Sequence, residues 1–169
     1  NIFPVFVDRP LTANFYAGPR DEYIRLVGRQ LKIGKLYLKE HVDGVGTVFS
    51  VPKSTLGAQR LVWHGRAVSG HAAPPPKPRH QPTLACLLDL EATPEKPLFL
   101  SKRDASAYFD KSRAPAWMRS WFVLPSIPVH ELMSFGEFDS LRDLEPFLDG
   151  SQISDIDYDS TLFPVSTCF

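Results

Sequence analysis

A proline-rich segment places the strongest constraint on how this chain can fold. Residues 70–82 have the sequence GHAAPPPKPRHQP. Its three consecutive prolines supply no amide donors and favour the polyproline II conformation. The segment therefore predicts a stiff surface connector, with a ligand for a proline-recognition module as the alternative. Helices and strands are expected on either side of it.

Composition leaves the function class open. The chain has 169 residues, which is long enough for one domain with a core. Its formal net charge is zero, so no overall basic excess points to nucleic acid. Charge is nevertheless uneven: basic residues greatly outnumber acidic ones over residues 32–79, whereas residues 131–159 are acidic on balance. Cys86 and Cys168 lack metal-ligand spacing. No apolar run is long enough for a membrane span, and we expect an intracellular protein without a membrane partner.

Hydrophobic periodicity predicts a mixture of helices and strands, and hence an α+β fold. A further prediction is that four large apolar residues at helical spacing are core residues: Trp117, Met118, Trp121 and Phe122. The predicted helices are residues 20–30, 83–90 and 138–148, with a helix or turn over 105–111, and the predicted strands are residues 36–38, 47–51, 60–64 and 97–103.

The most distinctive segment is residues 48–69, VFSVPKSTLGAQRLVWHGRAVS. Its two apolar stretches predict a two-stranded flap with Lys53 near the tip, Arg60 on the returning strand and Arg66 just beyond it. A lysine ammonium is a point charge and an arginine guanidinium a planar fork, and both complement phosphate oxygens. An ordinary solvated hairpin with scattered basic residues is the alternative.

Asp104 is the second candidate. It follows the predicted strand 97–103, and a carboxylate at the end of a hydrophobic strand can bind Mg²⁺, which prefers oxygen ligands. An aspartate before Ala105 and Ser106 is also a good helix cap, and the residues alone favour that role.

Taken together, the two segments resemble the reverse transcriptases of retroelement type. The fingers pattern of that family is matched by Pro52-Lys53, Arg60, Leu61-Val62, Arg66 and Ser69, and its first catalytic motif by Asp104-Ala105-Ser106-Ala107-Tyr108-Phe109. The sequence departs from the family at His64, where an acid is usual, and at Ser69, where asparagine is common.

The resemblance implies a role for each of these residues. Asp104 would be the catalytic aspartate that binds the two Mg²⁺ ions. Lys53 and Arg60 would grip the triphosphate of an incoming nucleotide, and Arg66 would help to build the fingers. Phe109 would lie under the sugar and exclude a 2′-hydroxyl, so that a deoxynucleotide triphosphate is selected.

The resemblance also implies an organisation in three parts. These are an N-terminal arm and helix (1–46), a fingers-like flap and connector (47–97) and a partial palm (98–169). The second and third catalytic motifs are not found, so we expect a fragment that binds a nucleic-acid template–primer but does not polymerise alone. A non-catalytic nucleic-acid-binding module and a decayed gene product without independent function are the alternatives. The strand 98–103 is expected to lack a partner on one side, which would favour self-association.

Overall fold

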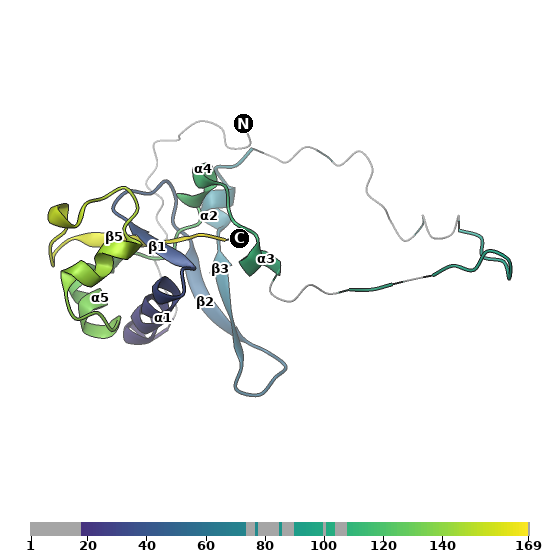
Figure 1. The fold of residues 1–169 in the computed structure, drawn as a ribbon, viewed down its shortest axis with the longest axis horizontal. Helices are drawn as coiled ribbons and strands as arrows, with labels where there is room; N and C mark the ends of the chain where they lie inside the picture. The colour runs from purple at the N-terminus through teal and green to yellow at the C-terminus, as the bar shows by residue number, and fades with distance from the viewer. Residues whose placement is uncertain are drawn as a thin grey trace.

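The computed structural model describes residues 18–73, 77, 85, 90–99, 101–103 and 108–168 of the 169 in the chain. Helices and antiparallel strands are mixed along it, which confirms the general α+β class (Figure 1). The helices are α1 (Arg20–Lys32), α2 (Arg66–Ser69), α3 (Tyr108–Lys111), α4 (Ala116–Arg119), α5 (Val129–Phe135) and the 3-10 helices η2 (Leu141–Phe147) and η3 (Ile153–Asp155). The strands are β1 (Leu36–Lys39), β2 (Thr47–Pro52), β3 (Gln59–His64), β4 (Ile127–Pro128) and β5 (Thr161–Ser166).

These strands form two antiparallel sheets. One has three strands in the order β1-β5-β4, and the other is the hairpin of β2 and β3. In the first sheet β5 is central, and its register with β1 runs from Leu36 opposite Ser166 to Lys39 opposite Phe163. A strand from the N-terminal part of the described chain therefore pairs with a strand from its C-terminal end.

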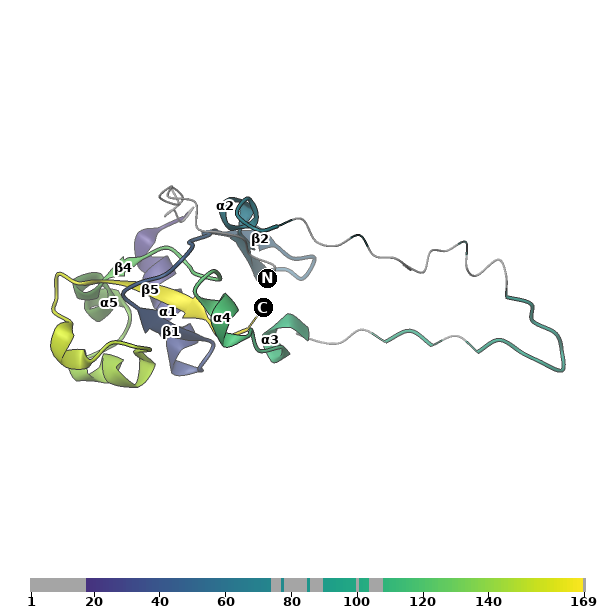
Figure 2. The same ribbon diagram turned by 90° about the horizontal axis from the view of Figure 1, so that it is seen from above.

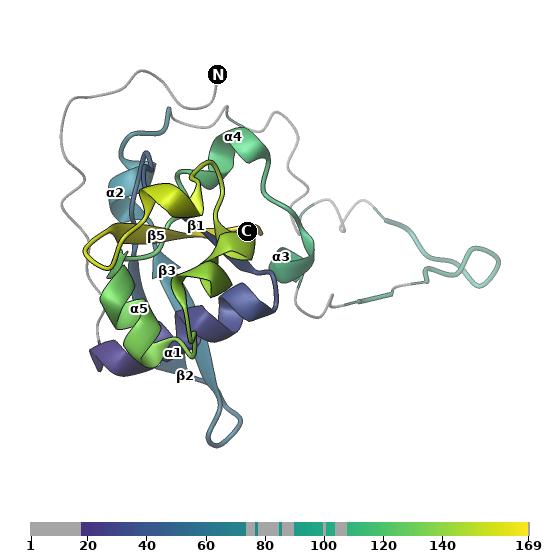
Figure 3. The same cartoon turned by 60° about the vertical axis from the view of Figure 1, so that its left-hand side comes forward.

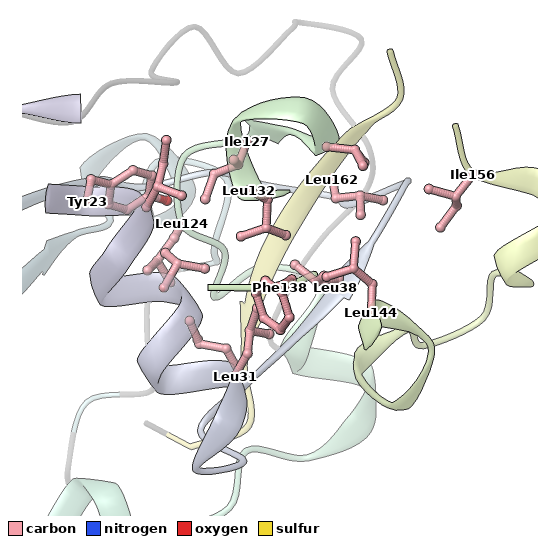
Figure 4. Close-up of a cluster of buried hydrophobic side chains, with 14 of the residues drawn as sticks. Tyr23, Leu31, Leu38, Leu124, Ile127, Leu132, Phe138, Leu144, Ile156 and Leu162 are labelled. Atoms are coloured by element: carbon pink, nitrogen blue, oxygen red, sulfur yellow. The ribbon is translucent and has the colours of Figure 1, made fainter. Parts of the chain in front are cut away.

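The larger hydrophobic core lies against one face of this sheet. Tyr23, Val27 and Leu31 recur every four residues along α1 and are fully buried, as expected for the apolar face of an amphipathic helix. Figure 4 shows α1 contributing Tyr23 and Leu31 to the same cluster as Leu132 of α5 and Leu38 of β1. α1 and α5 are direct neighbours in this arrangement.

A smaller cluster lies on the opposite face of the sheet. Val45, Val123 and Val165 are buried there, with Tyr37 packed beside them. Because Tyr37 alternates with the inward-facing leucines of β1, it points to the other side of the sheet. Burial on both faces leaves β5 enclosed by the rest of the chain.

The hairpin of β2 and β3 projects from this body (Figures 1 and 3). Its observed bounds confirm the two strands predicted at residues 47–51 and 60–64. The predicted helix 20–30 and strand 36–38 are likewise confirmed by α1 and β1.

The predicted buried strand over residues 97–103 is wrong in the part of it that the structure describes. Residues 97–99 and 101–103 have no regular secondary structure and are exposed, with Phe99 at 87%. Figure 2 shows residues 90–99 far from the helices and strands. The physical reason is that β5 takes the central place in the sheet, so these residues pair with no strand. The expected self-association through an unpaired edge at 98–103 loses its premise.

Two other predictions need correction. The four large apolar residues predicted as core do not belong to it: Trp117, in the single turn of α4, is 56% exposed, and Met118, Trp121 and Phe122 are only half-buried. The α-helix predicted over 138–148 is instead the shorter 3-10 helix η2. Pro146 lies inside it and has no amide proton to donate, which explains why an α-helical ladder is not completed.

The predicted helix 83–90 lies almost wholly outside the described residues, and helix α3 occupies the end of the predicted segment 105–111.

Candidate functional site

The candidate site is the basic hairpin, defined here as residues 47–64, comprising β2, β3 and the turn between them. Its ladder pairs Val51 with Arg60 and Pro52 with Gln59. A hydrogen bond from the Lys53 amide to the Ala58 carbonyl, 2.9 Å, continues the ladder by one pair. Gly57 has a φ of +75°, the conformation for which a tight turn favours glycine. The turn is therefore well defined by its own residues.

The register places Lys53 and Arg60 on the same face of the basic hairpin. Side chains alternate along a strand, so Lys53 points to the same side as Val51, and Val51 lies opposite Arg60. Lys53 and Arg60 are thus diagonal neighbours, which in an antiparallel pair lie roughly 7–8 Å apart. Both residues are exposed. The hairpin thus brings together the two cations predicted to bind phosphate.

No acidic residue lies near these cations in the sequence. The sequence contains no aspartate or glutamate between Asp43 and Asp89. Within the described ranges, Lys53, Arg60 and Arg66 take part in no ion pair. The basic residues that do pair with carboxylates there belong to the body of the molecule: Arg20, Arg25, Lys32 and Lys39. The basic hairpin therefore presents positive charge that an anion can neutralise.

Arg66 lies beside the hairpin rather than on it. It is the first residue of α2, directly after Gly65, and it is exposed. The amides of Ser69 and Gly70 donate to the carbonyls of Gly65 and Arg66 at 2.7 and 3.0 Å, which closes this single helical turn. Arg66 thus follows the end of β3 by two residues, and its role in building the fingers stays a prediction.

Trp63 attaches the basic hairpin to the body. Its indole Nε1 donates to the Val123 carbonyl at 2.9 Å, and the Gly46 amide donates to the same oxygen at 2.9 Å. A Cβ atom added at Gly46 or at Gly65 would overlap the indole ring, so the ring lies between two stretches of backbone that only glycine allows so close. Sequence reasoning missed this residue. The one available signal was a glycine just outside each strand of the hairpin.

Segment 122–124 links Trp63 to the central strand. The Phe122 ring lies 5.3 Å from the Trp63 ring, measured between centroids. The Leu124 amide donates to the Pro164 carbonyl at 2.8 Å, and the Ser166 amide donates to the Phe122 carbonyl at 2.9 Å. Through these contacts the orientation of the hairpin is coupled to the three-stranded sheet.

The other two predicted site residues are Asp104 and Phe109. Asp104 lies outside the described residues, and Phe109 belongs to α3 with its side chain outside them as well. Over the part of the chain that the structure describes, no group of three or more histidine, cysteine, aspartate or glutamate residues could hold a metal ion. A common site that joins Lys53 and Arg60 to Asp104, as the roles implied by the resemblance require, stays a prediction, and so does the Mg²⁺ site.

Comparisons of the chain with models of protein families, with curated proteins and with solved structures gave no match. A search of the described helices found none that is long and apolar enough to cross a membrane.

Proposed function

We propose that this chain carries the nucleotide-gripping fingers of a reverse-transcriptase-type, RNA-directed DNA polymerase. In this role it binds a template–primer and a deoxynucleotide triphosphate. The observation that carries the proposal is the placement of Lys53 and Arg60 on one face of an anchored hairpin without acidic residues. The matching motif around Asp104 and Phe109 supports it from the sequence side.

The chemistry of the two cations suits a triphosphate. Arg60 offers a planar fork that can donate two parallel hydrogen bonds to one phosphate group, and Lys53 adds a mobile point charge. Because both side chains are long and start from diagonal positions, they can reach neighbouring phosphate groups of one chain. The attachment through Trp63 reduces the freedom of the hairpin, so less entropy is lost when the ligand binds.

Catalysis is not proposed for the chain by itself. Metal-assisted phosphoryl transfer requires two ions held by several oxygen ligands, and the resemblance assigns only Asp104 to that task. Mg²⁺ therefore enters as the ion expected of the parent enzyme, and the role of Phe109 as the sugar gate rests on the resemblance alone.

Titration of the 169-residue chain with a deoxynucleotide triphosphate and with a labelled template–primer at low salt tests the proposal. Replacing Lys53 or Arg60 with alanine removes a charge-assisted contact, and we expect each to weaken triphosphate binding roughly tenfold. The matched control is Arg142→Ala, which removes an exposed arginine of η2 and should leave binding unchanged. Primer extension by the unmodified chain should be undetectable.

Two outcomes would separate the proposal from its alternatives. If template–primer binding depends on Lys53 and Arg60 while the triphosphate does not bind, the chain is a non-catalytic nucleic-acid-binding module. If neither ligand binds the unmodified chain more tightly than it binds the double variant Lys53→Ala/Arg60→Ala, the basic hairpin has no ligand-binding role.

A further inference from the structure

A second cluster of cations lies at the end of the three-stranded sheet, beyond the last pair of β1 and β5. A depression of about 390 Å³ is found there. We call it the cationic depression, and it is lined by Ile33, Gly34, Lys35, Lys111, Arg113, Arg119, Thr167 and Cys168. Figure 2 shows helices α3 and α4 beside the C-terminal end of β5, where these residues meet. No residue of the basic hairpin contributes to this lining.

The walls of the cationic depression are joined by backbone hydrogen bonds. The Thr167 amide donates to the Lys35 carbonyl at 3.0 Å, and the Ala114 amide donates to the Thr167 carbonyl at 3.1 Å. The Thr167 hydroxyl donates toward the carbonyls of Gly34 and Lys35 at 3.2 and 3.1 Å. Arg113 also forms an isolated antiparallel bridge with Cys168. Thr167 therefore holds two separate segments of chain at a set spacing.

One of the arginines is fixed in place by its surroundings. The Nε of Arg119 donates to the Ala114 carbonyl at 2.9 Å. Burial raises the pKa of the Tyr37 hydroxyl and Asp149 raises it further, while the nearby positive charge of Arg119 lowers it. A guanidinium has five N–H groups, so the bond to the Ala114 carbonyl orients Arg119 and leaves further donors for a ligand. Such an orientation reduces the entropy that binding would cost.

The charge of the depression is of one sign. Lys111, Arg113 and Arg119 come from different turns of the chain, and the lining contains no carboxylate among the described residues. Lys111 and Arg113 are accessible from solvent at the surface, so an anion can approach them. Cations held close together repel one another, and a bound anion relieves this repulsion.

We propose that the cationic depression binds phosphate groups, independently of the basic hairpin and of the function proposed for it. A phosphate group carries more charge than a carboxylate and has acceptor oxygens on several sides. It can therefore accept from Arg113 and Arg119 at once while Lys111 contributes a point charge. The group can belong to free pyrophosphate or to the backbone of a nucleic acid, because both present the same oxygens.

The test compares two ligands against variants of the full chain at low salt. Inorganic pyrophosphate and a single-stranded DNA oligonucleotide are titrated into the unmodified chain and into Lys111→Gln/Arg113→Gln. Both substitutions are at solvent-accessible positions and preserve side-chain length in part, so folding should be retained. The charge-matched control is Arg29→Gln/Arg142→Gln, also at exposed positions. We expect the first double variant to weaken binding at least roughly tenfold and the control to leave it unchanged.

The two ligands identify the source of the phosphate. Loss of pyrophosphate affinity assigns the site to free phosphates, whereas loss of oligonucleotide affinity alone assigns it to the backbone of nucleic acid. In either case, the ligand should shift the NMR signals of the Gly34 and Thr167 amides. Equal affinity in the Lys111→Gln/Arg113→Gln variant and in the control, for both ligands, would overturn the proposal. The proposal would also be overturned if only the Lys53→Ala/Arg60→Ala variant bound the two ligands more weakly. That result would leave the function proposed for the basic hairpin standing.

Discussion

Trp63 connects the candidate site to the folded body. Its side chain occupies a space that exists because residues 46 and 65 have no Cβ, and it shares the Val123 carbonyl with the Gly46 amide. A phosphate-gripping function needs Lys53 and Arg60 to be held in a constant position. That constancy depends on a residue that itself carries no charge.

We therefore predict that Gly65→Ala displaces the Trp63 indole. The added methyl group overlaps the ring, and relieving the overlap in a packed site typically costs about 1–3 kcal/mol of unfolding free energy. Urea unfolding measures the loss, and near-ultraviolet circular dichroism reports the changed surroundings of the tryptophan. Gly70→Ala is the control, because its added Cβ would lie 3.4 Å from its nearest neighbour, the Ala67 carbonyl oxygen. Equal stability of the two variants would contradict the anchoring role.

Local hydrogen bonds determine where several of the helices and strands begin and end. The periodicity of apolar residues alone does not determine these boundaries. The Asp143 carboxylate accepts a hydrogen bond from the Ser140 amide at 2.8 Å as part of a capping box at the start of η2, and a second one from the Asp139 amide at 3.0 Å. The hairpin turn and α2 are likewise closed by contacts within a few residues. Short elements of this kind are fixed by individual polar residues, so each can be tested by one substitution.

The capping box predicts a dependence of stability on pH. The Ser140 amide, more than any other group, holds the pKa of the Asp143 carboxyl below its ordinary value. A carboxyl whose pKa is lower in the folded than in the unfolded state stabilises the fold when it is ionised. This stabilisation is complete above the unfolded pKa of about 3.9. It is lost as the pH falls through that value toward the lower folded pKa. The free energy of unfolding should thus fall less steeply below about pH 5 in Asp143→Asn than in the unmodified chain.

Urea unfolding at a series of pH values measures this difference. Asp159→Asn removes the same charge from an exposed position and serves as the control. Parallel pH profiles for Asp143→Asn and the unmodified chain would show that the cap contributes nothing to the fold.

Across the molecule as a whole, β5 is the element that unites the chain. It pairs with β1 from the N-terminal part and with β4, and it supplies Leu162 to the larger core and Val165 to the smaller cluster. The basic hairpin is attached to the same strand through residues 122–124. Loss of β5 should consequently affect both the sheet and the candidate site.

We predict that Leu162→Ala destabilises the protein by about 2–5 kcal/mol, the range typical of a large aliphatic side chain removed from a core. The fully exposed Leu56 at the tip of the hairpin provides the control, and Leu56→Ala should change the free energy of unfolding very little. Thermal unfolding followed by circular dichroism measures both. A loss confined to part of the transition in Leu162→Ala would mean that β5 does not unite the molecule.

Local patterns in the amino-acid sequence are sufficient for the basic hairpin and for α1. The two apolar stretches on either side of the turn predict the hairpin, and the four-residue spacing of Tyr23, Val27 and Leu31 matches the buried face of α1. Both follow from the geometry of a single stretch of chain. The positions of Lys53 and Arg60 on the hairpin therefore follow from the order of the residues alone.

The choice of the central strand, in contrast, depends on contacts between distant segments. Pro164 within β5 and Pro128 within β4 carry no amide proton, and a proline ordinarily argues against an inner strand. Conversely, the apolar residues 97–99 have the composition of a strand but pair with none. The cationic depression is also tertiary, because its cations meet Thr167 only when β5 lies beside β1. Pairing between distant segments depends on which partners are free, and no local pattern records that.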